Sequence, residues 1–492
     1  MTGDGQETDR RKDDPQIDPA DEPAAQPTDV VAEEPPANPA LRRRVDLTEG
    51  NLLRKIVLLA WPIVVASFLQ WVMGVADVKM VGKLGPEAIA AVGQSRTAIF
   101  TFMTIIFAVA TGTQVLAARY MGERNPGGAS DVTRQALILS VLFGIIIIPA
   151  GYLFSPGVVS MMGAEGAVHE AATEYMRVYF FGAISLMINF FTISALRGAG
   201  DTLTPLWVLL GINSGNILFD WLLIFGIGPF PELGVAGAAW AVVISRTIGA
   251  IIQIWIVTCG RFAIQMPLIA RWRADLALWG KMFYIGVPSS IEGFSRNMAF
   301  LAIFWILNQT DAGRVAVAGY TVSMQLRLFG VMFGLALMSA AMTAVSQNMG
   351  ADDVKRAERS GWTVTWISVA ATALMGIVFI SLSPWLIRFF TDDAETIRWG
   401  VIALVTLSIA LPFTGASMGL AGSLRGAGDT LSPLYVTVAC VSVLAPGLAY
   451  LLTVVLGFGP MGAWIGLTIA WMLQAVTLGL IFKRGKWKHI KL

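Results

Sequence analysis

Long apolar runs alternate with short polar segments along the chain from about residue 56 to residue 482. Each run holds roughly 20 residues or more, and a helix of about 20 residues crosses the ~30 Å hydrocarbon core of a bilayer. The pattern therefore predicts an all-α integral membrane protein with twelve transmembrane helices. The expected ranges are 56–81, 88–118, 135–154, 173–196, 205–227, 235–258, 280–307, 315–346, 361–386, 397–423, 433–456 and 462–482.

The segment 1–45 has a different composition, because it is rich in Pro, Asp, Glu and Ala and contains few large apolar residues. Such a segment cannot bury enough surface to offset the entropy of ordering, so we expect a disordered cytoplasmic tail. It also lacks the apolar core of a signal peptide, which leaves the first span to direct membrane insertion.

The sequence is internally duplicated. The heptapeptide Leu-Arg-Gly-Ala-Gly-Asp-Thr at 196–202 recurs at 424–430. We call the distance along the sequence between equivalent residues of the two copies the repeat shift. Pro62 recurs as Pro288 at nearly the same shift. Each half contains six predicted spans, an even number, so both halves enter the membrane from the same side. We therefore expect two parallel repeats related by a pseudo-twofold axis along the membrane normal.

Lys and Arg residues in the short loops predict the orientation of these repeats. The face that carries both termini has 22 of them and the opposite face has five. Positive loops stay in the cytoplasm, so we expect both termini there, in a plasma membrane. The predicted divisions are the tail 1–45, an N-lobe 46–260, a cytoplasmic linker 261–279, a C-lobe 280–484 and a basic cytoplasmic tail 485–492.

Composition narrows the classes of function. Of the 492 residues, 55% are hydrophobic and 14% are charged, and the net charge is +2, which disfavours a nucleic-acid binder. Two Cys and two His residues provide neither a disulfide framework nor a His-based metal cluster or Ser-His-Asp triad. We expect no cofactor, no metal and no enzymatic activity.

Two acidic residues inside the spans of the N-lobe are the main candidates for function. Asp77 shares a helix face with Gln70, and Asp220 shares one with Asn213 and Asn216. A carboxylate inside a bilayer is costly and usually marks an ion or proton path. The two faces could converge on one cavity, where at least one carboxyl group would hold a proton near neutral pH. The alternative is two separate acids, each hydrogen-bonded to a neighbouring helix.

The C-lobe has one acidic residue well inside a span, Glu292, and Arg296 follows it one turn later. This spacing allows either a second cation site or a neutral pair that only stabilises the helix. Arg96, Arg246 and Arg327 are further cations inside spans. Structural pairing or contact between the lobes explains each of them at least as well as substrate binding.

The duplicated glycine-rich segments are expected to form cytoplasmic turns. Thr204-Pro205 and its repeat resemble an N-cap followed by a proline at the first helical position. We expect fixed hairpins anchored by arginines, with a gating role of the aspartates as the alternative. The turn residues are Arg197, Asp201, Arg425 and Asp429.

Matched prolines inside the first and seventh spans are candidate hinges. Pro62 and Pro288 each remove one helical hydrogen bond, so each helix is expected to kink or bend there.

Several of these motifs together resemble the MATE (multidrug and toxic compound extrusion) family. They are the lead-in at 46–50, Ala60-Trp-Pro62, Asp77 ahead of the segment 81–85, Asn216-xxx-Asp220 and both Leu-Arg-Gly-Ala-Gly-Asp copies. The resemblance covers about residues 46–484. It implies two six-helix lobes in a V around a central cavity, an N-lobe cation site of Asp77, Asn216 and Asp220, and an alignment of Glu292 with the C-lobe acid of some members.

The resulting hypothesis is an alternating-access antiporter that exports small amphiphilic, cationic organic compounds in exchange for H⁺ or Na⁺. We expect a monomer in the lipid bilayer. A flippase for lipid-linked saccharides, of the same wider superfamily, is the alternative transporter. An intramembrane enzyme acting on lipid head groups is disfavoured by the two histidines, and a passive channel or receptor by the duplicated, kinked lobes.

Overall fold

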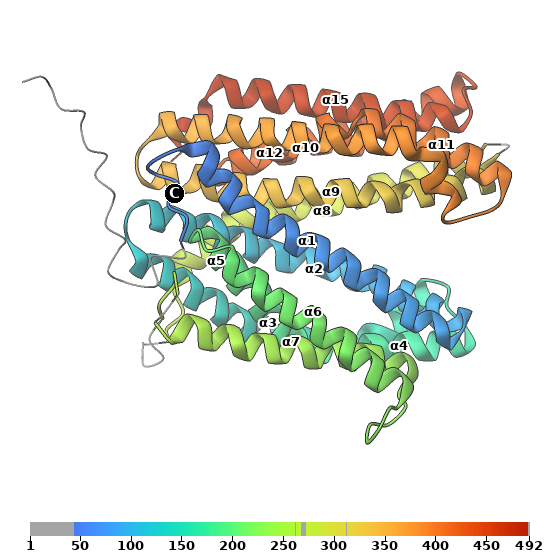
Figure 1. Ribbon diagram of the computed structural model, residues 1–492, viewed down its shortest axis with the longest axis horizontal. Helices are drawn as coiled ribbons and strands as arrows, with labels where there is room; N and C mark the ends of the chain where they lie inside the picture. The colour runs from blue at the N-terminus through green and yellow to red at the C-terminus, as the bar shows by residue number, and fades with distance from the viewer. Residues whose placement is uncertain (1–43, 261, 267–271, 311, 491–492) are drawn as a thin grey trace, which may run out of the picture. The chain divides into compact units, whose positions relative to one another are not determined.

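Helices form the regular structure of the chain, as the apolar runs predict (Figure 1). The computed structural model describes residues 44–260, 262–266, 272–310 and 312–490, which belong to one compact unit of the chain, and this part contains no strand. The predicted disordered tail falls almost wholly outside the described residues, as do residues 261 and 267–271 of the predicted linker.

The first half of the chain holds seven labelled α-helices and a short 3₁₀ turn, η2. Their bounds are α1 (Leu52–Val81), η2 (Gly82–Leu84), α2 (Pro86–Gly122), α3 (Pro126–Met161), α4 (Gly166–Phe181), α5 (Ala183–Gly198), α6 (Leu203–Phe225) and α7 (Gly234–Thr258).

The second half repeats this order. Its elements are α8 (Leu276–Asn308), α9 (Gly313–Gly350), α10 (Val354–Arg388), α11 (Ala394–Ile409), α12 (Leu411–Ala427), α13 (Leu431–Thr437), η3 (Val438–Leu444), α14 (Ala445–Tyr450), η4 (Leu451–Val455), α15 (Pro460–Arg484) and η5 (Lys486–His489).

Three predicted spans are not single α-helices. The fourth is divided into α4 and α5, bent by 55° at Gly182, and the tenth into α11 and α12, bent by 45° at Ala410. The repeat shift carries the first break onto the second. The eleventh span contains the π-helical segments η3 and η4, one on each side of Pro446. A proline lacks the N–H that continues an α-helical ladder, which accounts for this irregularity.

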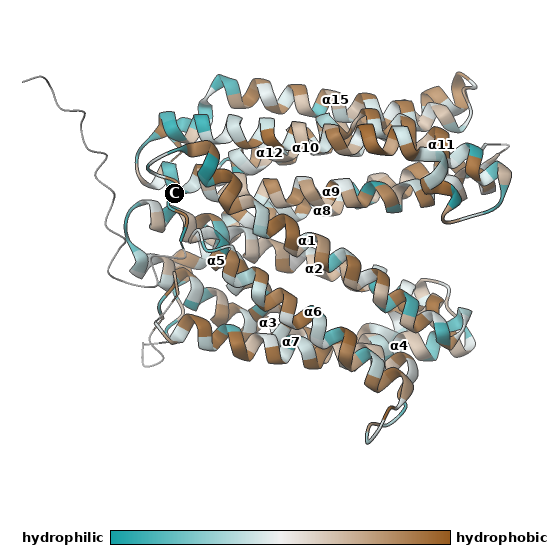
Figure 2. Ribbon diagram, viewed as in Figure 1, coloured by the Kyte–Doolittle hydropathy of each residue, from teal (hydrophilic) through white to brown (hydrophobic). Residues whose placement is uncertain are grey.

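Hydrophobic residues predominate along the middle of the helices, and hydrophilic residues gather at the helix ends (Figure 2). In the described residues, eight helices are long and apolar enough to cross a membrane, or eleven if each bent pair counts as one span. The predicted seventh span, α8, falls outside this set. It carries Lys281, Glu292 and Arg296, which lower its mean hydropathy.

Side-chain hydrogen bonds of the first half recur in the second. Ser95 Oγ donates to the carbonyl of Ala172 at 3.1 Å, and Ser323 Oγ donates to that of Gly400 at 2.8 Å. The repeat shift carries both partners of the first bond onto those of the second, so equivalent helices pack in the same way. This pattern supports the parallel repeat.

The halves also contact each other reciprocally through α2 and α9. A Cβ atom added to Gly122 would overlap the carbonyl oxygen of Gln347, and one added to Gly350 would overlap that of Arg119. The repeat shift relates Gly122 to Gly350 and Arg119 to Gln347. It therefore turns one contact into the other, with α2 and α9 exchanged. Such exchange is the signature of a twofold axis. The twelve-span count and the V around a central cavity stay predictions.

Candidate functional site

The Asp77 carboxylate forms an ion pair with the Arg96 guanidinium. Asp77 lies near the end of α1 with a side chain that is 1% exposed, and Arg96 lies on α2. The η2 turn and Gly85, whose φ is 109°, reverse the chain between these helices. Glycine adopts such a positive φ without steric cost, so this turn allows α2 to run back along α1.

The polar face of α6 is buried. Asn213, Asn216 and Asp220 are spaced three and four residues apart, and their exposed fractions are 7%, 1% and 0%. Both carboxylate oxygens of Asp220 and both amide atoms of Asn216 have no hydrogen-bond partner among the described residues. Buried polar groups are normally paired, so this face offers free oxygen ligands to a cation, a proton or water.

Arg96 connects the two helices electrostatically. Its guanidinium interacts with the carboxylate of Asp220 as well as with that of Asp77, and the fully buried Tyr175 interacts with both Arg96 and Asp220. The structure therefore brings the two predicted acids to a common neighbour. One guanidinium can neutralise one of two carboxylates, which leaves one negative charge when both acids are ionised.

The supporting residues of the predicted face differ in their surroundings. Gln70 is exposed on α1, whereas Asn213 is buried beside Asn216. From the sequence, structural pairing, contact between the lobes and substrate binding were all open for Arg96, and its pairing with Asp77 shows the first of these. The nearness of Arg96 to Asp220 depends on how α1, α2 and α6 pack. The spacing of residues within one helix cannot predict it. The coupling role of Asp77, Asn216 and Asp220 stays a prediction.

In the C-lobe, Glu292 is paired with two arginines. Its carboxylate accepts from Arg296 Nη2 at 2.7 Å and also forms an ion pair with Arg425 of α12. Glu292 and Arg425 side chains are 2% and 6% exposed. Two guanidinium groups thus surround one buried carboxylate, and the predicted pairing of Glu292 with Arg296 is present.

Arg327, on α9, is a further buried cation of this lobe. Its guanidinium lies 3.7 Å from the ring centroid of Trp471, and Nη1 contacts Met324 Sδ at 3.8 Å. None of the ion pairs among the described residues includes Arg327, and its Nε has no hydrogen-bond partner there. Arg327 and Arg296 are close enough to repel each other electrostatically.

The duplicated turns are fixed by their aspartates. Asp201 accepts hydrogen bonds from the backbone N–H of Thr204 at 3.0 Å and from its hydroxyl at 2.6 Å. Asp429 holds Ser432 in the same way at 3.0 and 2.7 Å. These bonds support the fixed-hairpin interpretation over gating.

Two details of that interpretation were wrong. The helices begin at Leu203 and Leu431, so Pro205 is the third helical residue and not the first. The N-cap residues are Thr202 and Thr430, and the carboxylates of the aspartates one residue earlier accept from a free N–H group of the first turn. Arg425 is not a free cytoplasmic anchor either, since it is buried against Glu292, while Arg197 is half-buried at the end of α5.

Pro62 and Pro288 are buried inside α1 and α8, and both helices continue through them. Their role as hinges stays a prediction.

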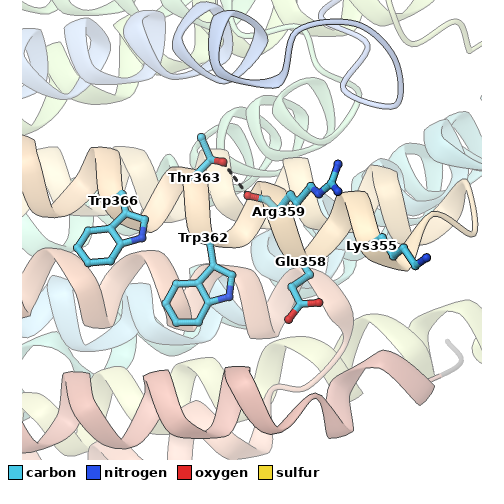
Figure 3. A pocket seen from close by; sticks show the side chains of 6 residues that line it. All are labelled: Lys355, Glu358, Arg359, Trp362, Thr363 and Trp366. Atoms are coloured by element: carbon cyan, nitrogen blue, oxygen red, sulfur yellow. Dashed lines mark hydrogen bonds between the residues drawn. The ribbon is translucent and has the colours of Figure 1, made fainter.

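Two surface pockets of the described residues lie away from these charges. One, of about 470 Å³, is lined by the first turns of α10 (Figure 3). The other, of about 520 Å³, lies where α3 meets the segment before α8. Neither contains a residue of the predicted cation sites.

Comparisons with known proteins agree with the fold. The MatE family model matches residues 62–222 and 288–451, one segment in each repeat. The probable multidrug resistance protein NorM of Thermotoga maritima is 27% identical over 443 residues, 89% of this chain and 94% of that protein. The FAD transporter of Shewanella oneidensis is 25% identical over 378 residues, 76% and 82% of the two chains.

A solved outward-facing conformation of a multidrug resistance MATE family transporter of the MOP superfamily superimposes with a TM-score of 0.84. It is 25% identical, and the match covers 89% of this chain and 97% of that one. The apolar helices and the family match define a multi-pass membrane protein, and the match to this transporter family and its relatives makes it a secondary transporter and not an enzyme. The chain belongs to the MatE family.

Proposed function

We propose that this protein exports small organic compounds by alternating access, in exchange for H⁺ or Na⁺ that binds at Asp220 and Asn216 beside the Asp77–Arg96 pair. The observation that supports the proposal best is the absence of hydrogen-bond partners for the oxygens of Asp220 and Asn216 among the described residues. An acidic group buried in the membrane without a full counter-charge favours binding of a proton or a cation.

The charges at this site provide a mechanism of exchange. Arg96 balances Asp77, so the remaining negative charge is that of Asp220. A proton or Na⁺ at Asp220 removes that charge, and a cationic group of the substrate would compete for the same carboxylate. Because the two ligands exclude each other, entry of the coupling ion promotes release of the substrate.

The proposed substrates are amphiphilic and carry a positive charge, as the relatives named for multidrug resistance and the acidic N-lobe site suggest. We place both termini in the cytoplasm of a cell whose plasma membrane contains the protein as a monomer. The membrane potential would then contribute about 2.3 kcal/mol per 100 mV for each proton that moves inward.

A second substrate class is favoured by the C-lobe. Arg296 and Arg425 there pair with the one carboxylate of Glu292, whereas Arg327 lies near Arg296 and over Trp471 and belongs to no ion pair among the described residues. A buried arginine without a carboxylate partner favours an anionic ligand. Compounds that also carry a carboxylate or phosphate are therefore proposed, and the FAD transporter among the relatives is consistent with them.

The test of coupling uses proteoliposomes with an imposed pH gradient or sodium gradient and a fluorescent cationic dye. We expect Asp220→Asn to lose most gradient-driven export, because an amide cannot exchange a charge. Asp392→Asn removes an exposed carboxylate and should behave like the wild type. Equal export by the wild type and the Asp220→Asn variant would contradict the proposal.

The test of the second substrate class compares the export of a dye that carries a carboxylate with the export of its methyl ester. Arg327→Gln should reduce export of the acid about tenfold and leave export of the ester unchanged, since one charge-assisted pair is worth roughly 1.4 kcal/mol or more. A variant that exports both dyes at wild-type rates would contradict an anion-binding role of the C-lobe.

A further inference from the structure

The first turns of α10 present two cations and two tryptophans on one face. Lys355, Arg359, Trp362 and Trp366 are spaced four, three and four residues apart, which places them along one stripe of the helix. They line the open pocket of about 470 Å³ together with Glu358 and Thr363, and Figure 3 shows all six side chains.

The positive charge of this pocket is not balanced inside the protein. Glu358 forms an ion pair with Lys488 of η5 at 2.7 Å. Lys355 and Arg359 are exposed and belong to none of the ion pairs in the described part of the chain. The pocket therefore keeps two free cations one helical turn apart, a spacing of about 5–6 Å.

The tryptophans mark the depth of the pocket in the membrane. Trp366 is 64% exposed, and Trp362 is held against Phe482 of α15 with its ring edge-on at a centroid distance of 5.4 Å. Beyond Trp366, α10 continues with exposed apolar side chains such as Leu374 and Ile377. Tryptophan prefers the boundary between head groups and acyl chains, so the cations lie at head-group level.

The pocket opens on the membrane face that carries both ends of the described chain. The Arg356 side chain, on the first turn of α10, donates to the carbonyls of Leu47 and Glu49 at 2.8 and 2.6 Å. Lys488 of η5 lies against the same helix. This face is the one that the distribution of Lys and Arg predicts to be cytoplasmic.

The repeat provides an internal comparison. The repeat shift relates this stripe to four positions on α3, where neither tryptophan is present. These positions are Gly127, Asp131, Arg134 and Ile138. Arg134 is paired there with Asp131 at 2.5 Å. Equivalent helices thus fold without the cationic and aromatic stripe, so the stripe is not a requirement of the fold.

We propose that this pocket binds the head group of an anionic phospholipid, with its phosphate between Lys355 and Arg359 and its glycerol and first acyl carbons against Trp362 and Trp366. A negative phosphate complements the two free cations, and the open side of the pocket continues into the apolar surface of α10. The proposal is independent of which compounds the protein exports.

The experiment is native mass spectrometry of the detergent-solubilised full chain, titrated with phosphatidylglycerol or phosphatidylcholine. The wild type should bind the first molecule of phosphatidylglycerol at least about tenfold more tightly, given roughly 1 kcal/mol for each basic residue. Lys355→Gln/Arg359→Gln should lose this preference and keep the weak binding of phosphatidylcholine.

A matched control is Arg134→Gln/Arg273→Gln, which removes two charges from the other pocket of the same membrane face. This control should keep the preference, and glycerophosphate without acyl chains should not displace the lipid. Trp366→Phe should bind as the wild type does, whereas Trp366→Ala should bind more weakly. The proposal is overturned if the Lys355/Arg359 variant keeps the preference, if the control loses it equally, or if glycerophosphate displaces the lipid.

Discussion

At the scale of single residues, one arginine interacts with two buried acids. The Arg96 guanidinium pairs with Asp77 and interacts with Asp220, so each carboxylate affects the electrostatic environment of the other through it. A change at Asp220 therefore alters the pairing of Asp77. In the exchange proposed above, this linkage would let one proton or cation that binds at Asp220 influence both α1 and α6, the helices that carry the acids.

Removing Arg96 should destabilise the protein more than removing the whole pair. Arg96→Gln leaves Asp77 buried without a partner, and loss of one member of such a pair costs about 3 kcal/mol. Asp77→Asn/Arg96→Gln should recover much of this loss. Thermal unfolding of the purified protein gives the comparison, and strictly additive effects would contradict the pairing.

A second residue-scale prediction concerns Asp46, which precedes α1. Burial raises the pKa of its carboxyl group, but hydrogen bonds from Thr48 and the charge of Arg44 outweigh this effect and leave the pKa below its ordinary value. A carboxyl group whose pKa is lowered by folding stabilises the protein above the pKa of the unfolded chain, about 3.9. That stabilisation is lost as the pH falls through the lower folded value.

Asp46→Asn should therefore reduce stability at pH 7 by up to about 1 kcal/mol and by less at pH 3, because the contribution of the carboxylate falls once the pH is below the pKa of the unfolded chain. Denaturation of both proteins at the two pH values checks this. A difference that persists unchanged at pH 3 would show that the carboxylate charge is not responsible.

At the residue scale, the sequence predicted the buried acidic faces but not the third position of Pro205 in α6, the exposure of Gln70 or the contacts between helices. The burial of Asp77, Asn213, Asn216 and Asp220 followed from helical spacing and from the cost of acids in the membrane. The pairing of Arg425 with Glu292 was not predicted, because it joins helices far apart in the sequence.

At the scale of elements, glycines set how closely helices approach. A Cβ atom on Gly286 of α8 would overlap the carbonyl of Ala108 on α2, whereas one on Gly293 of the same helix would meet nothing within 4 Å. Helical structure covers each predicted span, because long apolar runs favour helices in a membrane, but three of these spans are interrupted. The breaks at Gly182 and Ala410 were not predicted, although a glycine stands at the first and Pro412 follows the second at the start of α12.

Gly286→Ala should therefore destabilise the protein by about 2 kcal/mol or more, because a backbone oxygen cannot yield as a flexible side chain does. Gly293→Ala should be neutral or stabilise by up to about 1 kcal/mol, through the helix propensity of alanine. The melting temperatures of the two variants test the contact. Equal melting temperatures would contradict the close approach of α2 and α8.

At the scale of the whole molecule, the two repeats share a scaffold and differ in charge. The N-lobe site joins Asp77 and Asp220 to Arg96, and the C-lobe site joins Glu292 to Arg296 and Arg425, with Arg327 near Arg296. The hydrogen bonds that recur in both halves preserve the packing, while the unmatched charges are the reason for proposing a different ligand for each lobe. The sequence revealed the duplication directly, but this division of charge required the contacts across helices.

The orientation can be tested with the native cysteines. Cys259 is partly exposed after α7, and Cys440 is buried. A membrane-impermeant maleimide should label Cys259 in inside-out vesicles and not in intact cells. Pro229→Cys, made together with Cys259→Ser, should give the opposite pattern, because residue 229 lies in the loop before α7, at the other end of that helix. Labelling of Cys259 in intact cells would contradict cytoplasmic termini.

The most direct measurement of the central claim is the binding of a cationic substrate to the purified protein as a function of pH and of sodium concentration. Competition at Asp220 predicts that the wild type binds the substrate more weakly as protons or Na⁺ are added. The Asp220→Asn variant should bind weakly at every pH and sodium concentration. If the wild type binds with the same affinity under all these conditions, or if Asp220→Asn retains the full dependence, coupling through this acid is contradicted.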